Sequence, residues 1–390
     1  MEFRELIAKK VTELKPSGIR KFFDLLENME DAISLGVGEP DFQTPWHIRD
    51  AGVYSLEKGF TKYTPNAGMM ALRQEISRYM LRRFGLRYDP AGQIIVTVGG
   101  SEGIDLSLRM LLEPGDEVII PTPSFVCYGP LTIMAGGKPV YVETKQEDDF
   151  KLTPALLKGA LTEKTKVVVL PYPCNPTGGI MEKADLEAIA EILKDTRAAV
   201  LSDEIYAELS YGGKHCSPAS IPELYDRTIV VNGFSKAFAM TGWRLGYLCA
   251  PRDAIAQMVK IHQFGIMSAP TTSQYAAIEA MRSGDRDIEA MRAEYDRRRR
   301  FLVHGLREAG LECYEPKGAF YVFPCIRSTG LSSEEFCERF LMSQRVAVIP
   351  GSAFGPGGEG FVRMCYAASM DDLREALKRL CEFLRELKGE

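Results

Sequence analysis

A chain of 390 residues is longer than one ordinary domain of roughly 100 to 200 residues, which favours two domains. Hydrophobic residues make up 45% and charged residues 26%, a balance that is ordinary for a globular protein and argues against disorder. The net charge of −5 provides no broad positive field, so neither nucleic acid nor an acidic membrane is an expected partner.

The sequence indicates neither a metal site nor a disulfide framework. The nine cysteines are scattered, odd in number and without a CxxC pair, and the four histidines show no HExxH or HxH spacing. The N-terminal stretch MEFRELIAKKVTELKPSGIRKFF lacks the apolar core of a signal peptide, and no apolar run approaches the roughly 20 residues that span a bilayer. We therefore expect a soluble, cytoplasmic protein with reduced thiols and no bound metal.

From about residue 92 onward, short β-rich runs alternate with helical stretches. Most of the runs are continuously apolar, as expected when helices cover both faces of a sheet. Strands are expected at residues 94–98, 117–120, 139–142, 166–170, 198–202, 228–232 and 244–250. Helices are expected between them, for example at Glu102–Leu112, Lys183–Lys194 and 252–264. This alternation predicts an α/β domain with a mostly parallel, seven-stranded sheet.

The C-terminal part begins with a long charged helix over residues 288–310. Its four consecutive arginines, Arg297–Arg300, spread around the helix and therefore favour a solvated face over a nucleic-acid site. Beyond it the expected order is strand 319–323, helix 332–343, strands 346–349 and 361–366, and a final helix 370–388. We predict a large domain at 46–285, a small α+β domain at 286–390, and an N-terminal segment, 1–45, that packs with the small domain.

Candidate ligands for a bound molecule follow the predicted strands, because open α/β sheets bind beyond the carboxyl ends of their strands. Strand 94–98 leads into Gly99-Gly100-Ser101-Glu102 at a helix start, where free backbone N–H groups could bind a phosphate. The alternative is a turn with Ser101 as an N-cap. Strand 166–170 leads into a turn with three prolines and a glycine, which holds Asn175 at the sheet edge.

Two further strands end in groups that are costly to bury. Asp203 follows strand 198–202 and needs a cation unless it is a helix N-cap. Lys236 follows strand 228–232 among small and apolar residues, where burial lowers the pKa of an amine and makes it nucleophilic enough to form a Schiff base. A lysine whose stem lies on apolar surface is the alternative.

These residues, in this order, closely resemble the fold-type-I aminotransferases of the aspartate aminotransferase class, and look most similar to bacterial alanine and aromatic aminotransferases. The resemblance runs from about residue 17 to the C-terminus. The matching stretches are GVGEPDF (36–42), YTPNAG (63–68), NPTG (175–178), SDEIY (202–206), SKAFAMTGWRLGY (235–247) and VRMCYA (362–367).

The resemblance implies the fold of these enzymes, a homodimer, and pyridoxal phosphate as cofactor. Lys236 is expected to hold the cofactor as a Schiff base and to shuttle the proton between Cα and C4′. Asp203 is expected to pair with the pyridine nitrogen. Tyr206 and Asn175 are expected to hydrogen-bond the phenolic oxygen, and Phe125 to cover the ring, unless it is a plain core residue.

The other implied contacts are with the phosphate and the substrate. Ser235, Arg244 and the Ser101–Glu102 turn are expected to bind the phosphate, and Tyr63 to reach the phosphate of the neighbouring subunit. Arg363 matches the arginine that binds the substrate α-carboxylate, with Gly38 and Asn175 beside it. An exposed strand arginine is the alternative for Arg363.

The expected reaction is ping-pong transfer of an amino group from an L-amino acid to a 2-oxo acid such as 2-oxoglutarate. The sequence shows no convincing match to the second arginine that aspartate-specific members use. A C–S β-lyase or another elimination enzyme on the same fold remains an alternative, because those relatives keep Lys236, Asp203 and Arg363. A non-enzymatic sensor fused to a DNA-binding module is a second alternative, disfavoured by the short segment that precedes the motifs.

Overall fold

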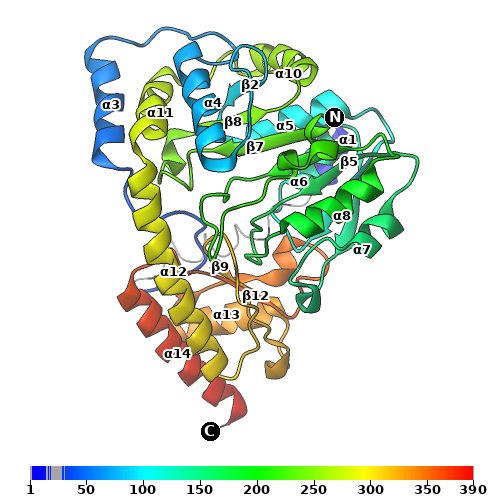
Figure 1. Ribbon diagram of the computed structural model, residues 1–390. Coiled ribbons are helices and arrows are strands. Elements are labelled where there is room, and N and C mark those ends of the chain that lie inside the picture. Colours follow the sequence, from blue (N-terminus) through cyan, green and yellow to red (C-terminus); the bar gives the residue numbers. More distant parts are fainter. Residues whose placement is uncertain (1, 15, 17, 19–28, 30, 390) are drawn as a thin grey trace.

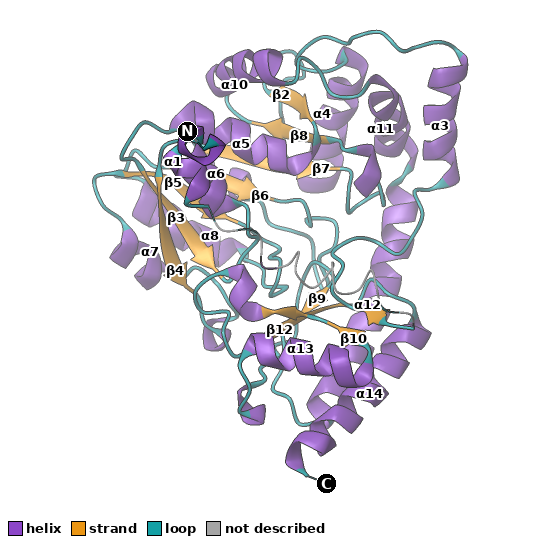
Figure 2. Cartoon of the chain, turned by 180° about the vertical axis from the view of Figure 1, so that it is seen from behind, coloured by secondary structure: helices purple, strands orange, loops and turns teal. Residues whose placement is uncertain are grey.

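The computed structural model describes all residues except 1, 15, 17, 19–28, 30 and 390. Figure 1 shows a larger part built on a seven-stranded sheet and a smaller part that contains the C-terminus. The helix α12 (Asp285–Glu308) runs from one part into the other, and Figure 2 shows the same division from behind.

The central sheet is the α/β sheet expected from the apolar runs. Its strand order is β2-β8-β7-β6-β5-β3-β4, in which β8 alone runs antiparallel to its neighbours. The strands are β2 (Ile94–Thr97), β3 (Glu117–Thr122), β4 (Lys138–Glu143), β5 (Thr165–Leu170), β6 (Ala199–Asp203), β7 (Thr228–Gly233) and β8 (Gly246–Cys249). All seven expected strands are confirmed within a few residues.

Helices cover both faces of this sheet because alternate strand residues point to opposite faces. Val167 and Val169 of β5 join a core with α5 (Gly99–Leu111), α6 (Tyr128–Met134) and α10 (Arg252–Gly265). Val168 and Leu170 join a core with α7 (Pro154–Ala160) and α8 (Lys183–Leu193). At the β2 end the cover consists of α3 (Trp46–Glu57), α4 (Met70–Phe84) and α11 (Thr271–Ser283).

The C-terminal part has a small antiparallel sheet in the order β11-β12-β9. The helices and strands of this part are β9 (Tyr321–Val322), α13 (Ser333–Gln344), β10 (Val346–Ala347), β11 (Ile349–Pro350), β12 (Val362–Cys365) and α14 (Met370–Lys388). The single strand expected at 346–349 was wrong. The chain changes partners there, since β10 pairs in parallel with β1 (Ile33–Ser34) and β11 pairs with β12.

The N-terminal segment contacts both parts of the molecule. Leu35 lies in the core of the C-terminal part, whereas the Nζ atom of Lys10, in the short helix α1 (Lys9–Thr12), donates to the carbonyl of Met134 on α6 at 3.0 Å. The remainder of the segment lies partly outside the described residues. Short elements complete the chain: α9 (Pro222–Tyr225) and 3₁₀ turns at Phe3–Leu6, Gln146–Asp148, Pro218–Ser220, Thr241–Trp243, Arg327–Thr329 and Gly351–Phe354.

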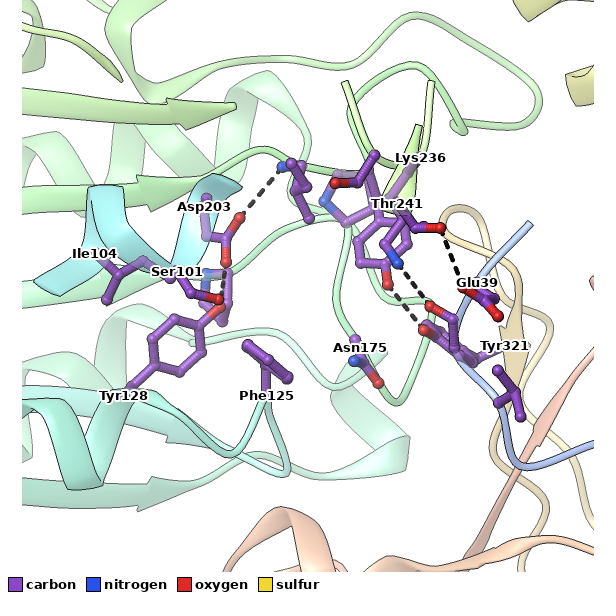
Figure 3. Close-up of a pocket in the computed structure, with 18 of the residues that line it drawn as sticks. Glu39, Ser101, Ile104, Phe125, Tyr128, Asn175, Asp203, Lys236, Thr241 and Tyr321 are labelled. Carbon is purple, nitrogen blue, oxygen red and sulfur yellow. Dashed lines mark hydrogen bonds between the residues drawn. The ribbon is translucent and has the colours of Figure 1, made fainter. Parts of the chain in front are cut away.

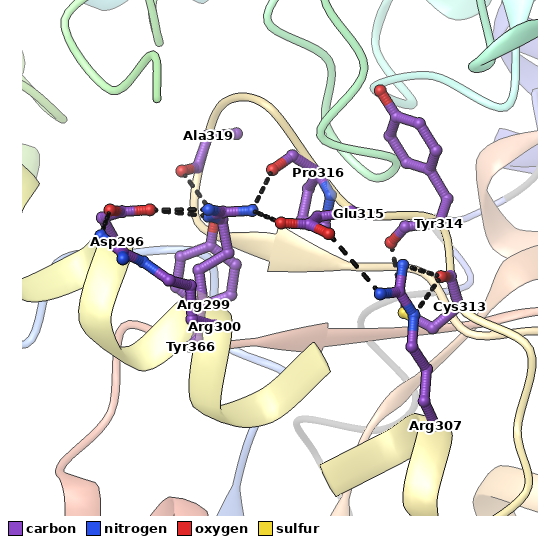
Figure 4. Close-up of polar contacts among 10 residues, drawn as sticks. All are labelled: Asp296, Arg299, Arg300, Arg307, Cys313, Tyr314, Glu315, Pro316, Ala319 and Tyr366. Atoms are coloured by element: carbon purple, nitrogen blue, oxygen red, sulfur yellow. Dashed lines mark hydrogen bonds and ion pairs between the residues drawn. The ribbon is translucent and has the colours of Figure 1, made fainter. Parts of the chain in front are cut away.

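The four arginines of α12 do not form a solvated face. Arg297 and Arg300 are exposed, as expected, but Arg298 and Arg299 are buried. The Arg298 guanidinium lies 2.8 Å from Asp41, and Arg299 bridges α12 to the segment 313–319 (Figure 4). The expectation failed because α12 lies between the two parts of the molecule and is covered on two sides.

Candidate active site

A cavity of about 450 Å³ lies where the carboxyl ends of the parallel strands meet the C-terminal part (Figure 3). Ten of the twelve site residues expected from the sequence line it: Gly38, Ser101, Phe125, Asn175, Asp203, Tyr206, Ser235, Lys236, Arg244 and Arg363. The side chains of Glu102 and Tyr63 do not. Residues more than 300 positions apart in the sequence therefore share one cavity.

Lys236 follows β7 and reaches into this cavity. Its Nζ atom donates to the carbonyl of Gly38 at 2.6 Å and lies 5.8 Å from the ring centre of Tyr206. Burial lowers the pKa of Lys236 to about 8, and the positive charges of Arg363 and Arg244 act in the same direction. The apolar sequence context predicts a shift in this direction.

Asp203 ends β6 at the opposite side of the cavity and is buried. Its carboxylate accepts a hydrogen bond from the Tyr128 hydroxyl at 2.7 Å and one from the Ile205 backbone N–H at 3.2 Å. Burial raises the pKa of Asp203, and the two hydrogen bonds partly oppose that shift. No helix begins at Asp203, so the N-cap alternative was wrong.

Tyr206 is held by a residue that sequence reasoning missed. Its hydroxyl lies 2.8 Å from the hydroxyl of Tyr321 on β9, and burial raises the pKa of both phenols. Tyr321 also explains Gly38, because a Cβ atom at that position would collide with the Tyr321 hydroxyl. The absence of a side chain at Gly38 thus lets the chain approach both Tyr321 and Lys236.

Arg363 is a buried cation that faces the cavity from β12. It is 3% exposed, so the exposed-arginine alternative was wrong. Its Nη1 donates to Asn175 Oδ1 at 2.8 Å and its Nη2 to the carbonyl of Gly36 at 2.6 Å, while Nε is buried without a partner among the described residues. No carboxylate among the residues that the structure describes pairs with this guanidinium. The guanidinium is therefore suited to an anionic ligand.

A second anion-binding corner lies at the start of α5. The helix begins at Gly99 with Val98 as its N-cap, so the Ser101 N-cap alternative was wrong. Among the described residues, the N–H groups of Gly99, Gly100 and Ser101 have no backbone partner. The guanidinium of Arg244 lies so close to Gly99 that a Cβ atom there would stand 2.9 Å from Nη2. Backbone donors and a cation therefore converge at this corner, and Ser235 also lines the cavity.

Glu102 and Tyr63 lie elsewhere. The Glu102 carboxylate turns back along α5, where it accepts from the Val98 N–H and lies 2.6 Å from His262 Nδ1, so only its backbone can face the cavity. Tyr63 is 83% exposed on the outside of the molecule. Tyr63 therefore does not line the cavity of its own chain.

Comparison with known proteins agrees with this geometry. The sequence matches the family described as Aminotransferase class I and II over residues 30–383. It is 52% identical over 376 residues to the putative aminotransferase YugH of Bacillus subtilis (96% of this chain, 97% of that protein) and 47% identical over 378 residues to an aspartate aminotransferase of Pyrococcus abyssi (96% and 97%).

Solved structures show the same relationship. The aromatic aminotransferase from Pyrococcus horikoshii OT3 has a TM-score of 0.90 at 46% identity, covering 94% of this chain and 99% of that one. The aspartate aminotransferase from Thermus thermophilus with maleate has a TM-score of 0.92 at 38% identity, covering 96% and 99%.

This chain therefore belongs to the aminotransferase class I and II family. It is a pyridoxal-phosphate-dependent enzyme that transfers amino groups, which confirms the fold, the enzyme class and the cofactor expected from the sequence motifs.

The cavity fits pyridoxal phosphate on physical grounds. The unpaired N–H groups at the start of α5 and the neighbouring guanidinium of Arg244 suit a phosphate. The buried carboxylate of Asp203 retains lone pairs that could accept from a ring nitrogen, and the amine of Lys236 could react with an aldehyde.

Two other features of the described residues bear on function. None of their helices combines the length and the apolar composition that a bilayer crossing requires. No group of three or more His, Cys, Asp or Glu side chains among them is arranged to hold a metal ion.

Proposed function

We propose that this aminotransferase acts on L-amino acids with neutral side chains, of the aromatic or alanine type. The carrying observation is the charge of the cavity. Three cations line it among the described residues: Lys236, Arg244 and Arg363. In this proposal each of them binds the cofactor or the α-carboxylate, which are the same for every amino-acid substrate. The lining near them is largely apolar, and the one further charged group besides Asp203 is Glu39, which would repel a second carboxylate.

In this proposal Lys236 is the covalent attachment point of the cofactor and the group that moves the substrate proton. With a pKa of about 8 instead of 10.5, the neutral fraction of the amine at pH 7 is about one in ten rather than about one in three thousand. The released amine therefore acts as a general base at the substrate Cα and returns the proton as a general acid.

The remaining roles concern the two ends of the ring. Pyridoxal phosphate, when bound, supplies an electron-withdrawing ring that stabilises negative charge at the substrate Cα. Asp203 keeps the ring nitrogen protonated, with Tyr128 orienting its carboxylate. Tyr206 donates to the phenolic oxygen, as does Asn175 through Nδ2, because its Oδ1 is already occupied by the substrate-binding Arg363. Phe125, which lines the cavity, would cover the ring.

Anion recognition is divided between two guanidinium groups. Arg244, Ser235 and the backbone donors of Gly100 and Ser101 hold the phosphate, and the backbone of Glu102 extends this turn. Arg363 holds the α-carboxylate of every substrate, with Gly38 and Asn175 beside it. The two anions are thereby fixed at separate corners of the cavity, which orients the substrate Cα toward Lys236.

The assembly proposed is a cytoplasmic homodimer in which Tyr63 of each subunit reaches the phosphate held by the other. The exposure of Tyr63 supports this assembly, as does that of other large aromatic side chains that a subunit contact could cover: Trp46, Tyr54, Phe60 and Phe264. We also propose the domain division 46–285 and 286–390, with segment 1–45 assigned to the small domain. The C-terminal part has a hydrophobic core of its own, which supports that division, although a few residues of the large part, such as Phe150 and Tyr211, also pack into it.

A panel of amino donors against 2-oxoglutarate and pyruvate tests the substrate proposal. The expected result is a higher kcat/KM for phenylalanine, tyrosine or alanine than for aspartate. A preference for aspartate would contradict it. Release of pyruvate and ammonia from a cysteine conjugate without any oxo acid measures the β-lyase alternative, and we expect this rate to be minor.

A further inference from the structure

Behind the cofactor corner at the start of α5 lies a pair of ionisable side chains, the half-buried Glu102 and the buried His262. Glu102 belongs to the first turn of α5, but its carboxylate lies on the far side of that turn from the cavity. One carboxylate oxygen accepts from the N–H of Val98, the N-cap residue, and the other lies 2.6 Å from Nδ1 of His262. His262 stands on α10, 160 residues away in sequence.

The buried ring of His262 leaves one of its nitrogen atoms without a hydrogen-bond partner among the described residues. Its side chain is fully buried, and the nitrogen concerned is Nε2. An ionised carboxylate can only accept hydrogen bonds. In the bond between Glu102 and His262, Nδ1 must therefore be the donor, whether the imidazole is neutral or charged. A buried polar atom without a partner opposes folding, so burial of this ring has a cost that its contact with Glu102 offsets only in part.

The turn that this pair supports is the one that offers donors to the phosphate. The hydrogen bond from the Val98 N–H to the Glu102 carboxylate closes a loop at the start of α5. Gly99, Gly100 and Ser101 lie inside that loop. Thr97 fixes the same turn from the other side, because its hydroxyl donates to the carbonyl of Gly99 at 2.8 Å. Gly99 has a φ of +79°, so without such restraints this segment would have wide conformational freedom.

We infer that His262 and Glu102 are positioning residues for the phosphate end of the cofactor. Neither side chain lines the cavity. Glu102 fixes the direction of the N–H groups of Gly100 and Ser101, and His262 fixes Glu102 in its turned-back position and prevents the carboxylate from swinging toward the phosphate, where like charges would repel. This inference rests on the proposed placement of the phosphate at the start of α5.

The test uses the holoenzyme and two readouts that do not depend on turnover. The first is the ³¹P NMR shift of the bound cofactor phosphate, and the second is the rate at which holoenzyme loses its visible absorbance during dialysis. His262→Leu and Glu102→Ala are expected to move the ³¹P signal toward that of free cofactor. They should also speed cofactor loss about 10- to 100-fold, the range for losing support of a hydrogen-bonded charge.

Conservative variants separate positioning from mere stability. His262→Asn keeps a donor near the Nδ1 position and should stay within about threefold of wild type, as should Glu102→Gln, which keeps the acceptor for Val98. The matched control is His47→Leu, which removes a histidine bonded to Glu279 at 2.9 Å and Asp287 at 3.0 Å away from the cavity. It should lower thermal stability and leave both readouts unchanged.

Three results would overturn the inference, the third of which applies if the leucine variant does not fold. One is an unchanged ³¹P shift and release rate in His262→Leu. Another is that His47→Leu speeds cofactor loss as much as His262→Leu does. If His262→Leu does not fold, a His262→Asn holoenzyme that loses cofactor as fast as Glu102→Ala also overturns it. A wild-type enzyme with no bound-phosphate signal would instead refute the proposed phosphate site itself.

Discussion

Replacing Lys236 by methionine in the cofactor-free protein should stabilise the fold at neutral pH. Burial lowers the pKa of this amine from 10.5 to about 8, so the folded state carries its proton at a cost of about 3 kcal/mol below pH 8. Methionine removes that cost. It also leaves the carbonyl of Gly38 without its donor at 2.6 Å, which destabilises the variant by about 1 kcal/mol. The net expectation at pH 7 is a gain of about 2 kcal/mol.

The pH dependence gives this prediction its sign. A lowered lysine pKa means that the unfolded chain binds more protons between pH 8 and 10.5, so the cost in the wild type disappears as the pH rises through that window. By pH 10 the cost should be below about 1 kcal/mol, and the advantage of the Lys236→Met variant should vanish or reverse.

Urea unfolding of both cofactor-free proteins at several pH values measures these differences. The control is Lys260→Met, an exposed lysine hydrogen-bonded to Gln257, whose effect should stay within about 0.5 kcal/mol. A Lys236→Met protein that is less stable than wild type at pH 7, or a difference that does not change between pH 7 and 10, would refute the reasoning.

Three further outcomes follow from the site. Arg363→Ala should lower kcat/KM at least about 100-fold for every amino donor, since it removes a buried, hydrogen-bonded cation; an effect confined to acidic donors in steady-state assays would contradict its role. Tyr128→Phe should raise the pKa of Asp203 further, because its hydrogen bond holds that pKa down; the acid limb of the kcat profile should move to higher pH, and an unmoved limb would count against it. Mixing Tyr63→Ala with Lys236→Ala subunits should restore activity at one site per hybrid dimer, whereas no recovery over the separate variants would argue against shared sites.

Much of the cavity could be predicted from the sequence because of where its residues stand. Asn175, Asp203 and Lys236 each follow a continuously apolar run, and parallel strands bring such positions to one edge of a sheet. Arg363 could be placed through the VRMCYA motif, although its burial on β12 has no local signal. The strand positions in the central sheet were predictable for the same reason, since β-rich runs of four to six residues alternate there with helices.

The residues that sequence reasoning missed act through contacts between distant segments. Tyr128 and Tyr321 are buried aromatic residues whose hydroxyl partners lie 75 and 115 positions away. The Ser101–Glu102 turn was expected to offer backbone donors to the phosphate, but the pairing of the Glu102 side chain with His262 was not predicted. The burial of Arg298 depends on how α12 is enclosed, which helical periodicity does not specify.

The attachment of the cofactor is the claim on which the other roles depend. Borohydride reduction of the holoenzyme, followed by proteolysis and mass spectrometry, measures directly which side chain carries it. The account predicts that the pyridoxyl group is found on Lys236 and is absent from a Lys236→Met protein treated in the same way. A reduced pyridoxyl adduct on another lysine of the wild-type holoenzyme, with Lys236 unmodified, would contradict it.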